Sequence, residues 1–101
     1  MKLLTKEILK KLPKLGVTSE LKSEDINVVV KFFAPWGSWS WYAVEFDGDD
    51  LFFGYVRGDF PELGMFSLSE LQSVTGPFGL KIERDRYFGN HTLQDVMDKI
   101  L

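Results

Sequence analysis

The sequence predicts an α+β fold, in which an antiparallel sheet of four to five strands packs with two to three short helices. A β-branched and aromatic run over residues 26–33 precedes two more strand-like segments with short links, which is the order of an antiparallel meander. Apolar residues recur at helical spacing near both ends of the chain. With 101 residues, the chain is expected to form a single domain over residues 1–101.

The first predicted element is a short amphipathic helix that begins after Thr5. Ile8, Leu12 and Leu15 fall at i, i+4 and i+7, and lysines occupy most of the remaining positions. Thr5 carries the hydroxyl group of a good N-cap, and Pro13 ends the regular helix near Lys11 or Leu12. A polar, irregular segment is expected to follow.

Three strands are predicted in succession, over residues 26–33, 39–46 and 51–57. In the first strand, alternation places the side chains of Ile26, Val28, Val30 and Phe32 on one face. Pro35 and Gly37 interrupt the chain before the second strand, and Asp47-Gly48 supplies the positive φ angles of a tight turn before the third. These short links predict antiparallel neighbours.

The next segment contains the best-specified helix start in the chain. After a brief strand over residues 63–66, Ser67 and Glu70 match a capping box. Phe66 and Leu71 are placed to form the accompanying hydrophobic staple. We therefore expect a short helix, which Gly76-Pro77 ends.

Two elements are predicted in the remainder of the chain. Residues 80–87 read as a strand, with Leu80 and Ile82 facing inward and charged residues following them. Residues 92–101 read as a terminal helix, because their apolar residues fall at helical spacing. The predicted helices most simply cover one face of the sheet, which leaves the other face to be explained.

The segment from Lys31 to Tyr42 is the most distinctive part of the sequence, since it holds all three tryptophans. Strict alternation in the second strand separates Trp39, Trp41 and Ala43 from Tyr42, Val44 and Phe46. Both faces of the meander are therefore aromatic. The tryptophans either close the edge of the core or form an exposed binding surface, and Trp36, in the turn, is expected to contact a partner.

Composition excludes several classes of function. The net charge of −3 and the pI near 5.1 argue against a dominant electrostatic nucleic-acid footprint. The absence of cysteine removes disulfides, thiolate nucleophiles and zinc–thiolate sites. No apolar run is long enough to span a membrane and no signal peptide is evident, so we expect a cytoplasmic protein without a membrane association.

No combination of residues specifies a reaction, so we expect a protein that is not an enzyme and needs no cofactor or metal. The acidic turn around Asp47 lacks the spaced ligands of a calcium loop, and phosphate-binding glycine motifs are absent. A small hydrolase that uses Glu83, Asp85 and His91 would require these side chains to meet in one pocket.

Two kinds of binding function remain open. The first is an interaction module that binds another protein through an aromatic surface. The second is a single-stranded nucleic-acid binder that stacks bases on the same aromatic face and contacts phosphates with nearby basic residues. The proposed anchors are Phe33, Trp36, Trp39 and Trp41, and the proposed phosphate contacts are Lys31, Arg57, Arg84 and Arg86.

Short motifs recur in a specific order along nearly the whole chain. They include Leu3-Leu4-Thr5, Leu12-Pro13, Lys31-Phe32-Phe33, Pro35-Trp36-Gly37, Trp39, Trp41-Tyr42, Leu51-Phe52-Phe53-Gly54-Tyr55-Val56, Glu62-Leu63-Gly64, Phe66-Ser67-Leu68, Glu70-Leu71, Gly76-Pro77, Gly79-Leu80 and Ile82-Glu83-Arg84-Asp85. This order resembles an uncharacterised bacterial domain-of-unknown-function family, DUF2958. The resemblance implies a module of a mobile genetic element (plasmid, phage or integrative element), with a role in element transfer, DNA handling or evasion of host defence. It supplies no catalytic residues.

Overall fold

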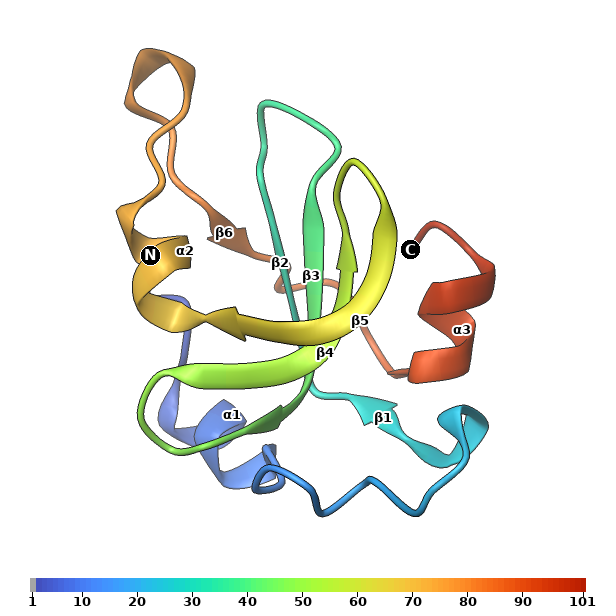
Figure 1. Cartoon of the computed structure of the whole chain (residues 1–101). Coiled ribbons are helices and arrows are strands. Elements are labelled where there is room, and N and C mark those ends of the chain that lie inside the picture. Colours follow the sequence, from blue (N-terminus) through green and yellow to red (C-terminus); the bar gives the residue numbers. More distant parts are fainter. Residues whose placement is uncertain (1) are drawn as a thin grey trace.

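The structure, a computed structural model that describes residues 2–101, contains a five-stranded antiparallel sheet of order β5-β4-β3-β2-β6 (Figure 1). Its strands are β2 (Val30–Phe33), β3 (Ser40–Phe46), β4 (Leu51–Arg57), β5 (Pro61–Ser67) and β6 (Glu83–Arg84). Strands β1 (Asn27–Val28) and β7 (His91–Thr92) form a separate two-stranded sheet. The helices are α1 (Lys6–Lys11), α2 (Leu68–Ser73) and α3 (Leu93–Asp98), with short 3-10 turns at Ser23–Asp25 and Pro77–Gly79. The predicted α+β meander is confirmed.

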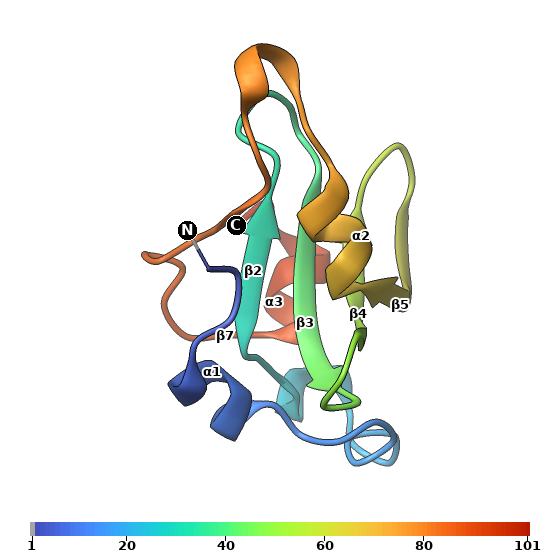
Figure 2. The same cartoon turned by 90° about the vertical axis from the view of Figure 1, so that its left-hand side faces the viewer.

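Helices cover both faces of the sheet, so the expectation that they cover only one face is wrong. Helix α3 lies on one side of the sheet, whereas α1 and α2 lie on the other (Figure 2). The reason is that both faces carry aromatic side chains, and each face needs an apolar layer against it. The sheet therefore separates two hydrophobic cores.

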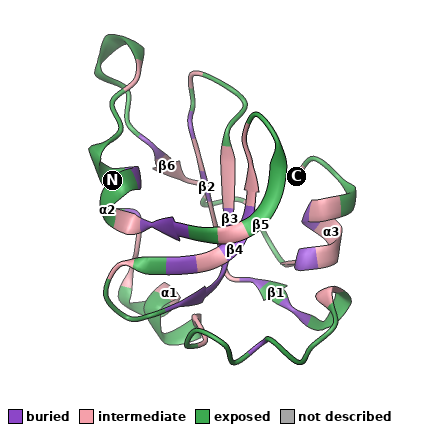
Figure 3. Cartoon of the chain, viewed as in Figure 1, coloured by how far each residue is buried: buried purple, intermediate pink, exposed green. Residues whose placement is uncertain are grey.

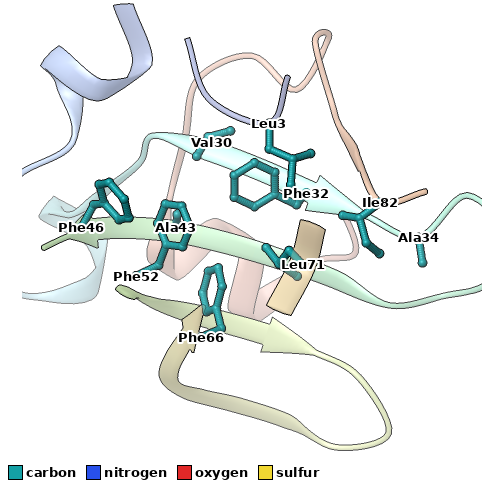
Figure 4. Close-up of a cluster of buried hydrophobic side chains, with 10 residues drawn as sticks. All are labelled: Leu3, Val30, Phe32, Ala34, Ala43, Phe46, Phe52, Phe66, Leu71 and Ile82. Atoms are coloured by element: carbon teal, nitrogen blue, oxygen red, sulfur yellow. The ribbon is translucent and has the colours of Figure 1, made fainter. Parts of the chain in front are cut away.

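The first core lies between the sheet and the N-terminal segment with α2. The ring of Phe52 is at its centre, with the ring of Phe46 stacked at 4.5 Å and the ring of Phe66 stacked at 5.2 Å between centroids (Figure 4). Leu3 and Leu71 close this core from outside the sheet. The remaining buried members are Val30, Phe32, Ala34, Ala43 and Ile82.

The second core lies under α3. The side chains of Tyr42, Val44 and Val96 are fully buried there, and Phe88 packs against Tyr42 with 5.9 Å between ring centroids. The hydroxyl of Tyr42 donates a hydrogen bond of 2.8 Å to the backbone oxygen of Leu101. Burial raises the pKa of the Tyr42 phenol, which remains protonated and able to donate this bond at neutral pH.

A β-bulge in β3 changes which face Phe46 occupies. Ala43 pairs with Gly54, but the next pair along β4 joins Phe53 to Glu45, so Val44 is the extra residue. The bulge shifts the alternation by one residue and moves Phe46 into the first core, together with Ala43. The predicted grouping of Phe46 with Tyr42 and Val44 is therefore wrong.

The predicted strand over residues 26–33 is divided in two. Strand β1 pairs with β7 and buries Ile26 and Val28 in the core under α3, whereas Val30 in β2 belongs to the opposite core. The two halves meet at Val29, whose N–H donates to the carbonyl oxygen of Ala43 at 2.9 Å. Ile26 and Val28 therefore enter one core and Val30 enters the other, although simple alternation predicts one shared face. The cause is that the chain passes from one sheet to the other at this point.

The predicted N-caps are present, but the reciprocal capping box is formed by Thr92 and Asp95 and not by Ser67 and Glu70. One strand is also shorter than expected. Thr5 and Ser67 are the N-caps of α1 and α2, and their hydroxyl oxygens accept from the N–H groups three residues later at 3.2 Å. Within the predicted strand over 80–87, only Glu83–Arg84 pairs with the sheet. Across residues 2–101, no helix combines the length and the hydrophobicity needed to cross a bilayer.

Candidate protein-binding surface

Three connections come together at one end of the sheet, which we call the tryptophan end. They are the β2–β3 connection over residues 34–39, the β4–β5 turn over residues 58–60 and the loop over residues 74–81 (Figures 1 and 2). The contacts between them are made by tryptophan rings against glycine backbone, since a side-chain carbon at Gly58 or Gly76 would overlap a tryptophan ring. Bulky rings need this space, and glycine leaves it free.

Trp36, the tryptophan expected to contact a partner, is partly buried at this end. Its ring packs against Gly76 and against the first core. The turn that carries Trp36 is held by hydrogen bonds of 3.0 Å from the N–H of Ala34 to Trp39 and 3.1 Å from the N–H of Gly37 to Ala34. Trp36 therefore attaches the loop over 74–81 to the sheet.

Trp39 and Trp41 lie on the same side of the sheet, as alternation predicts, with 5.7 Å between ring centroids. Trp41 is partly buried against the first core, whereas Trp39 remains 40% exposed. The ring of Trp39 covers Gly58 in the β4–β5 turn. The tryptophan segment thus combines both predicted roles, because Trp36 and Trp41 support the core and Trp39 reaches the surface.

Two exposed phenylalanines at the tryptophan end are not apparent from the sequence analysis. Phe60, in the β4–β5 turn, is 80% exposed, and Phe78, at the tip of the loop over 74–81, is fully exposed. Both loop tips are green, meaning exposed, in the burial view (Figure 3). For Phe78, the flanking residues could have indicated its exposure. It lies between Pro77 and Gly79, in a turn that leaves a large side chain little to pack against.

The loop that carries Phe78 is a closed and well-connected structure. The N–H of Gly76 donates to Leu80 at 2.7 Å, the N–H of Leu80 donates to Pro77 at 3.1 Å, and Thr75 forms a β-bridge with Lys81. Phe78 has φ 57° and ψ 24°, which is the left-handed region that bulky residues rarely adopt. The loop therefore holds the Phe78 ring in solvent at a cost of about 1–2 kcal/mol in backbone energy.

The proposed basic residues are divided between the two faces of the sheet. Arg84 lies opposite Phe32, on the face that carries Trp41. Lys31 and Arg57 lie opposite Tyr42 and Ser40 in the strand register, on the face covered by α3, whereas Trp41 points to the other face. The ammonium of Lys31 donates to the backbone oxygen of Leu101 at 2.6 Å and forms an ion pair of 3.6 Å with Asp85. Lys31 is therefore engaged in connecting the sheet to the C-terminal residues.

Arg57 has a similar structural role. Its guanidinium donates to the carbonyl oxygens of Val96 at 2.6 Å and Lys99 at 3.3 Å, and it lies 5.4 Å from the centre of the Tyr55 ring. These carbonyls belong to the C-terminal end of α3, where a cation is favourable. Arg57 thus fixes α3 against the sheet.

The other proposed site residues are dispersed. Arg84 donates to the backbone carbonyl of Lys2, and Arg86 is exposed in the connection after β6. Phe33 is partly buried, with the Lys31 ammonium 5.8 Å from its ring centre on the α3 face. The structure therefore places the three tryptophans at one end of the sheet, with Trp39 and Trp41 in ring contact, whereas the basic residues assigned to phosphate contacts are spread over both faces.

Two of the three residues considered for hydrolysis, Asp85 and His91, take part in other contacts. Asp85 pairs with Lys31 and accepts from the N–H of Tyr87 at 2.9 Å. The imidazole ring of His91 packs on Phe88 with 4.7 Å between ring centroids. Within residues 2–101, no group of three or more metal-ligating side chains is placed to hold an ion.

A hollow, which we call the apolar groove, lies on the α3 side of the sheet. It has a volume of about 520 Å³ and is bounded by strands β4 and β5, by residues 15–23 and by the start of α3. Its apolar lining comes from Leu15, Leu21, Ile26, Phe53, Leu63, Met65 and Leu93. It lies on the face of the sheet that carries Phe53 and Tyr55, opposite to the face that carries Trp41.

Buried Glu45 fixes one wall of the apolar groove. Its carboxylate accepts hydrogen bonds from the N–H of Gly16 at 2.9 Å, from the N–H of Thr18 at 2.8 Å and from the Thr18 hydroxyl. Burial alone raises the pKa of this carboxyl, but the hydrogen bonds outweigh burial and leave the pKa lowered. Glu45 is thus an ionised anchor for the loop over residues 15–21.

Comparison with known families adds one result. The statistical model of the DUF2958 family, described as a protein of unknown function, matches residues 3–98. The chain belongs to the DUF2958 family. No curated protein and no solved structure gives a significant match. The matched range of this DUF2958 domain includes both the tryptophan end and the apolar groove.

Proposed function

We propose that this DUF2958 domain is a small non-catalytic interaction module that binds another protein through the tryptophan end. The observation that carries this proposal is the exposure of two phenylalanine rings on loops held in place by tryptophans. Large exposed aromatic side chains are costly in water and are the usual anchors of protein interfaces. Because the Phe78 loop is closed by its own hydrogen bonds, little conformational entropy is lost when a partner covers it.

The chemistry of the tryptophan end favours a partner surface with apolar pockets. Trp39 provides a further exposed ring, and exposed Asp59 lies beside Phe60 in the β4–β5 turn. Two of the four proposed phosphate contacts are not available beside this carboxylate, since Lys31 and Arg57 bind backbone oxygens on the opposite face. A protein partner therefore fits better than a single-stranded nucleic acid.

The proposal also covers the biological context and the cellular compartment in which the domain acts. The family resemblance supports a module carried by a mobile genetic element, which acts in the transfer of the element, in DNA handling or against host defence. The absence of cysteine is compatible with a reducing compartment and supports a cytoplasmic location.

Site-specific photo-crosslinking tests the proposal. A photoreactive phenylalanine analogue replaces Phe60, Phe78 or, as a matched control, Tyr87, an exposed aromatic residue on a different connection. We expect positions 60 and 78 to give the same protein adduct in the native host, and position 87 to give none. The crosslinked protein is then purified and titrated with the wild type and with the F60A/F78A variant, which we expect to bind at least tenfold more weakly.

The outcome that contradicts the proposal is equally concrete. Binding of the purified partner that is unchanged in F60A/F78A, or adducts that form equally from position 87, excludes the tryptophan end as the interface.

Oligonucleotide titration at low salt tests the nucleic-acid alternative. Tryptophan quenching that is lost in Trp39→Ala and weakens as salt rises supports that alternative instead.

A further inference from the structure

We infer that the outer edge of β5 binds an extended peptide segment of a partner as an additional strand, with its alternate apolar side chains in the apolar groove and its flanking residues positively charged. This surface is separate from the exposed rings of the tryptophan end. The inference goes beyond the proposed function, and either one can fail without the other.

The two edges of the five-stranded sheet differ strongly. At one edge, β6 has only two residues, Glu83–Arg84. At the other edge, β5 has seven residues, Pro61–Ser67, and among residues 2–101 it pairs only with β4. Proteins usually shorten, cover or charge an edge strand, because its free N–H and C=O groups can pair with another chain. The long edge of β5 is therefore a template for an added strand.

The side chains of β5 that face the apolar groove are themselves apolar and exposed. Leu63 and Met65 lie opposite Tyr55 and Phe53 of β4, which places them on the α3 side of the sheet. Each is 49% exposed, although both contribute to the groove lining. Exposed apolar residues beside an apolar hollow mark a surface that gains stability when it is covered.

The geometry of a β-sheet connects the free edge to the apolar groove. In a strand added to β5, every second side chain points to the α3 side and lies about 4.5–5.5 Å from its neighbour on β5. Those side chains would extend beside Leu63 and Met65, toward the wall that contains Leu21. Backbone pairing would supply affinity, and the apolar groove would select alternating apolar residues.

The acidic residues near the apolar groove favour a positively charged partner segment. Exposed Glu20 and Glu24 are next to the groove residues Leu21 and Ser23, whereas Glu62 lies opposite Val56 and points to the other face of the sheet. Lys22 is the only cation between residues 15 and 25. An extended segment with lysine or arginine at its ends is attracted to this rim, whereas a second copy of the same chain would bring the same acidic residues and be repelled.

Peptide selection with the intact protein tests the inference. A random dodecapeptide library displayed on phage is selected on the wild type, with the L63K/M65K variant used to remove other binders. We expect enriched sequences with apolar residues at alternate positions and basic flanks. A synthetic enriched peptide should bind L63K/M65K at least tenfold more weakly, bind the control Leu9→Lys normally, and lose affinity as salt rises. Leu9 is a comparably exposed leucine on α1.

Hydrogen exchange shows how the peptide binds. With the wild type, the enriched peptide should slow amide exchange in residues 61–67, and circular dichroism should show that L63K/M65K remains folded. Three results overturn the inference: selection that enriches no alternating pattern, binding that is insensitive to L63K/M65K, or no protection of β5. Sedimentation that instead reveals a dimer, abolished by L63K/M65K, would assign the edge to a second copy and also overturn it.

Discussion

The ring of Trp36 lies directly against the backbone of Gly76, and a side-chain carbon at that glycine would come within 2.3 Å of the ring. This contact joins the β2–β3 connection to the loop after α2, although the two residues are far apart in the sequence. Both the position of the Phe78 loop and the partial burial of Trp36 depend on it. The contact therefore links the stability of the fold to the shape of the proposed binding surface.

Replacement of Gly76 by alanine should displace the Trp36 ring. The added methyl group overlaps the ring, so the variant should lose about 1–3 kcal/mol of unfolding free energy. Its tryptophan emission should shift to longer wavelength, and acrylamide should quench it more strongly. Gly37→Ala, in the β2–β3 connection, is the control, because a carbon at Gly37 has open space. Equal stability and emission in the two variants would contradict the packing described.

Replacement of Gly54 by alanine should disrupt the sheet more severely. A side-chain carbon at Gly54 would lie 1.8 Å from the carbonyl oxygen of Tyr42, which is backbone and cannot move aside as a side chain can. We expect a loss of about 3 kcal/mol or more in chemical denaturation. The matched control is Gly64→Ala, since Gly64 is the cross-strand partner of Gly54 on β5 and has open space. A Gly54→Ala variant as stable as Gly64→Ala would show that the β3–β4 spacing is wider.

Replacement of Glu45 by glutamine should reveal a pH-dependent anchor. The pKa of Glu45 is lower in the folded protein than in the unfolded chain, so its stabilisation is complete above the unfolded pKa and is lost as pH falls through the folded pKa. At pH 7 the variant should be less stable by about 1–3 kcal/mol, because charged hydrogen bonds to Gly16 and Thr18 are removed.

The pH profile separates this effect from a general loss of packing. Denaturation curves of the wild type and of Glu45→Gln should converge as pH decreases below about 4, where the unfolded carboxyl is protonated. The exposed Glu62→Gln serves as the control and should follow the wild type throughout. A stability difference that does not change with pH would assign the role of Glu45 to shape alone.

Replacement of Arg57 by methionine should loosen α3 from the sheet. The variant keeps an apolar stem but removes the hydrogen bonds to the carbonyl oxygens of Val96 and Lys99, with an expected cost of about 1–2 kcal/mol. Mass-spectrometric hydrogen exchange should show faster exchange in residues 93–98. Arg86→Met, at an exposed arginine, should leave exchange in α3 unchanged. If both variants behave like the wild type, Arg57 is not an anchor of α3.

Local sequence signals predicted the helix starts and the turns. Thr5 and Ser67 are N-caps in the structure, since a hydroxyl group three residues before a free N–H is sufficient for this bond. The third strand, Leu51–Arg57, was also predicted with its observed bounds, because it lies between two clear turns. In contrast, the bulge at Val44 and the break at Val29 were missed, as both depend on how β3 meets its neighbours.

The candidate surface was predicted only in part. The tryptophans are indeed grouped at one end of the sheet, but their exposure depends on glycines from two other connections. Phe60 and Phe78 were missed because a single aromatic residue in a turn has no periodic pattern to reveal its exposure. Lys31 and Arg57 were assigned to phosphates, whereas Arg57 binds carbonyl oxygens at the C-terminal end of α3 and Lys31 binds the backbone oxygen of Leu101, which lies beyond α3.

The sequence by itself determined the α+β class, the meander and the capped helices, because these follow from periodicity and from hydrogen bonds between residues close in the chain. Only the tertiary structure decided which face each aromatic residue occupies, and which rings remain in solvent. Those outcomes depend on contacts between distant segments, such as Trp36 with Gly76 and Glu45 with Thr18. The same long-range packing leaves β5 with a free edge and the apolar groove beside it.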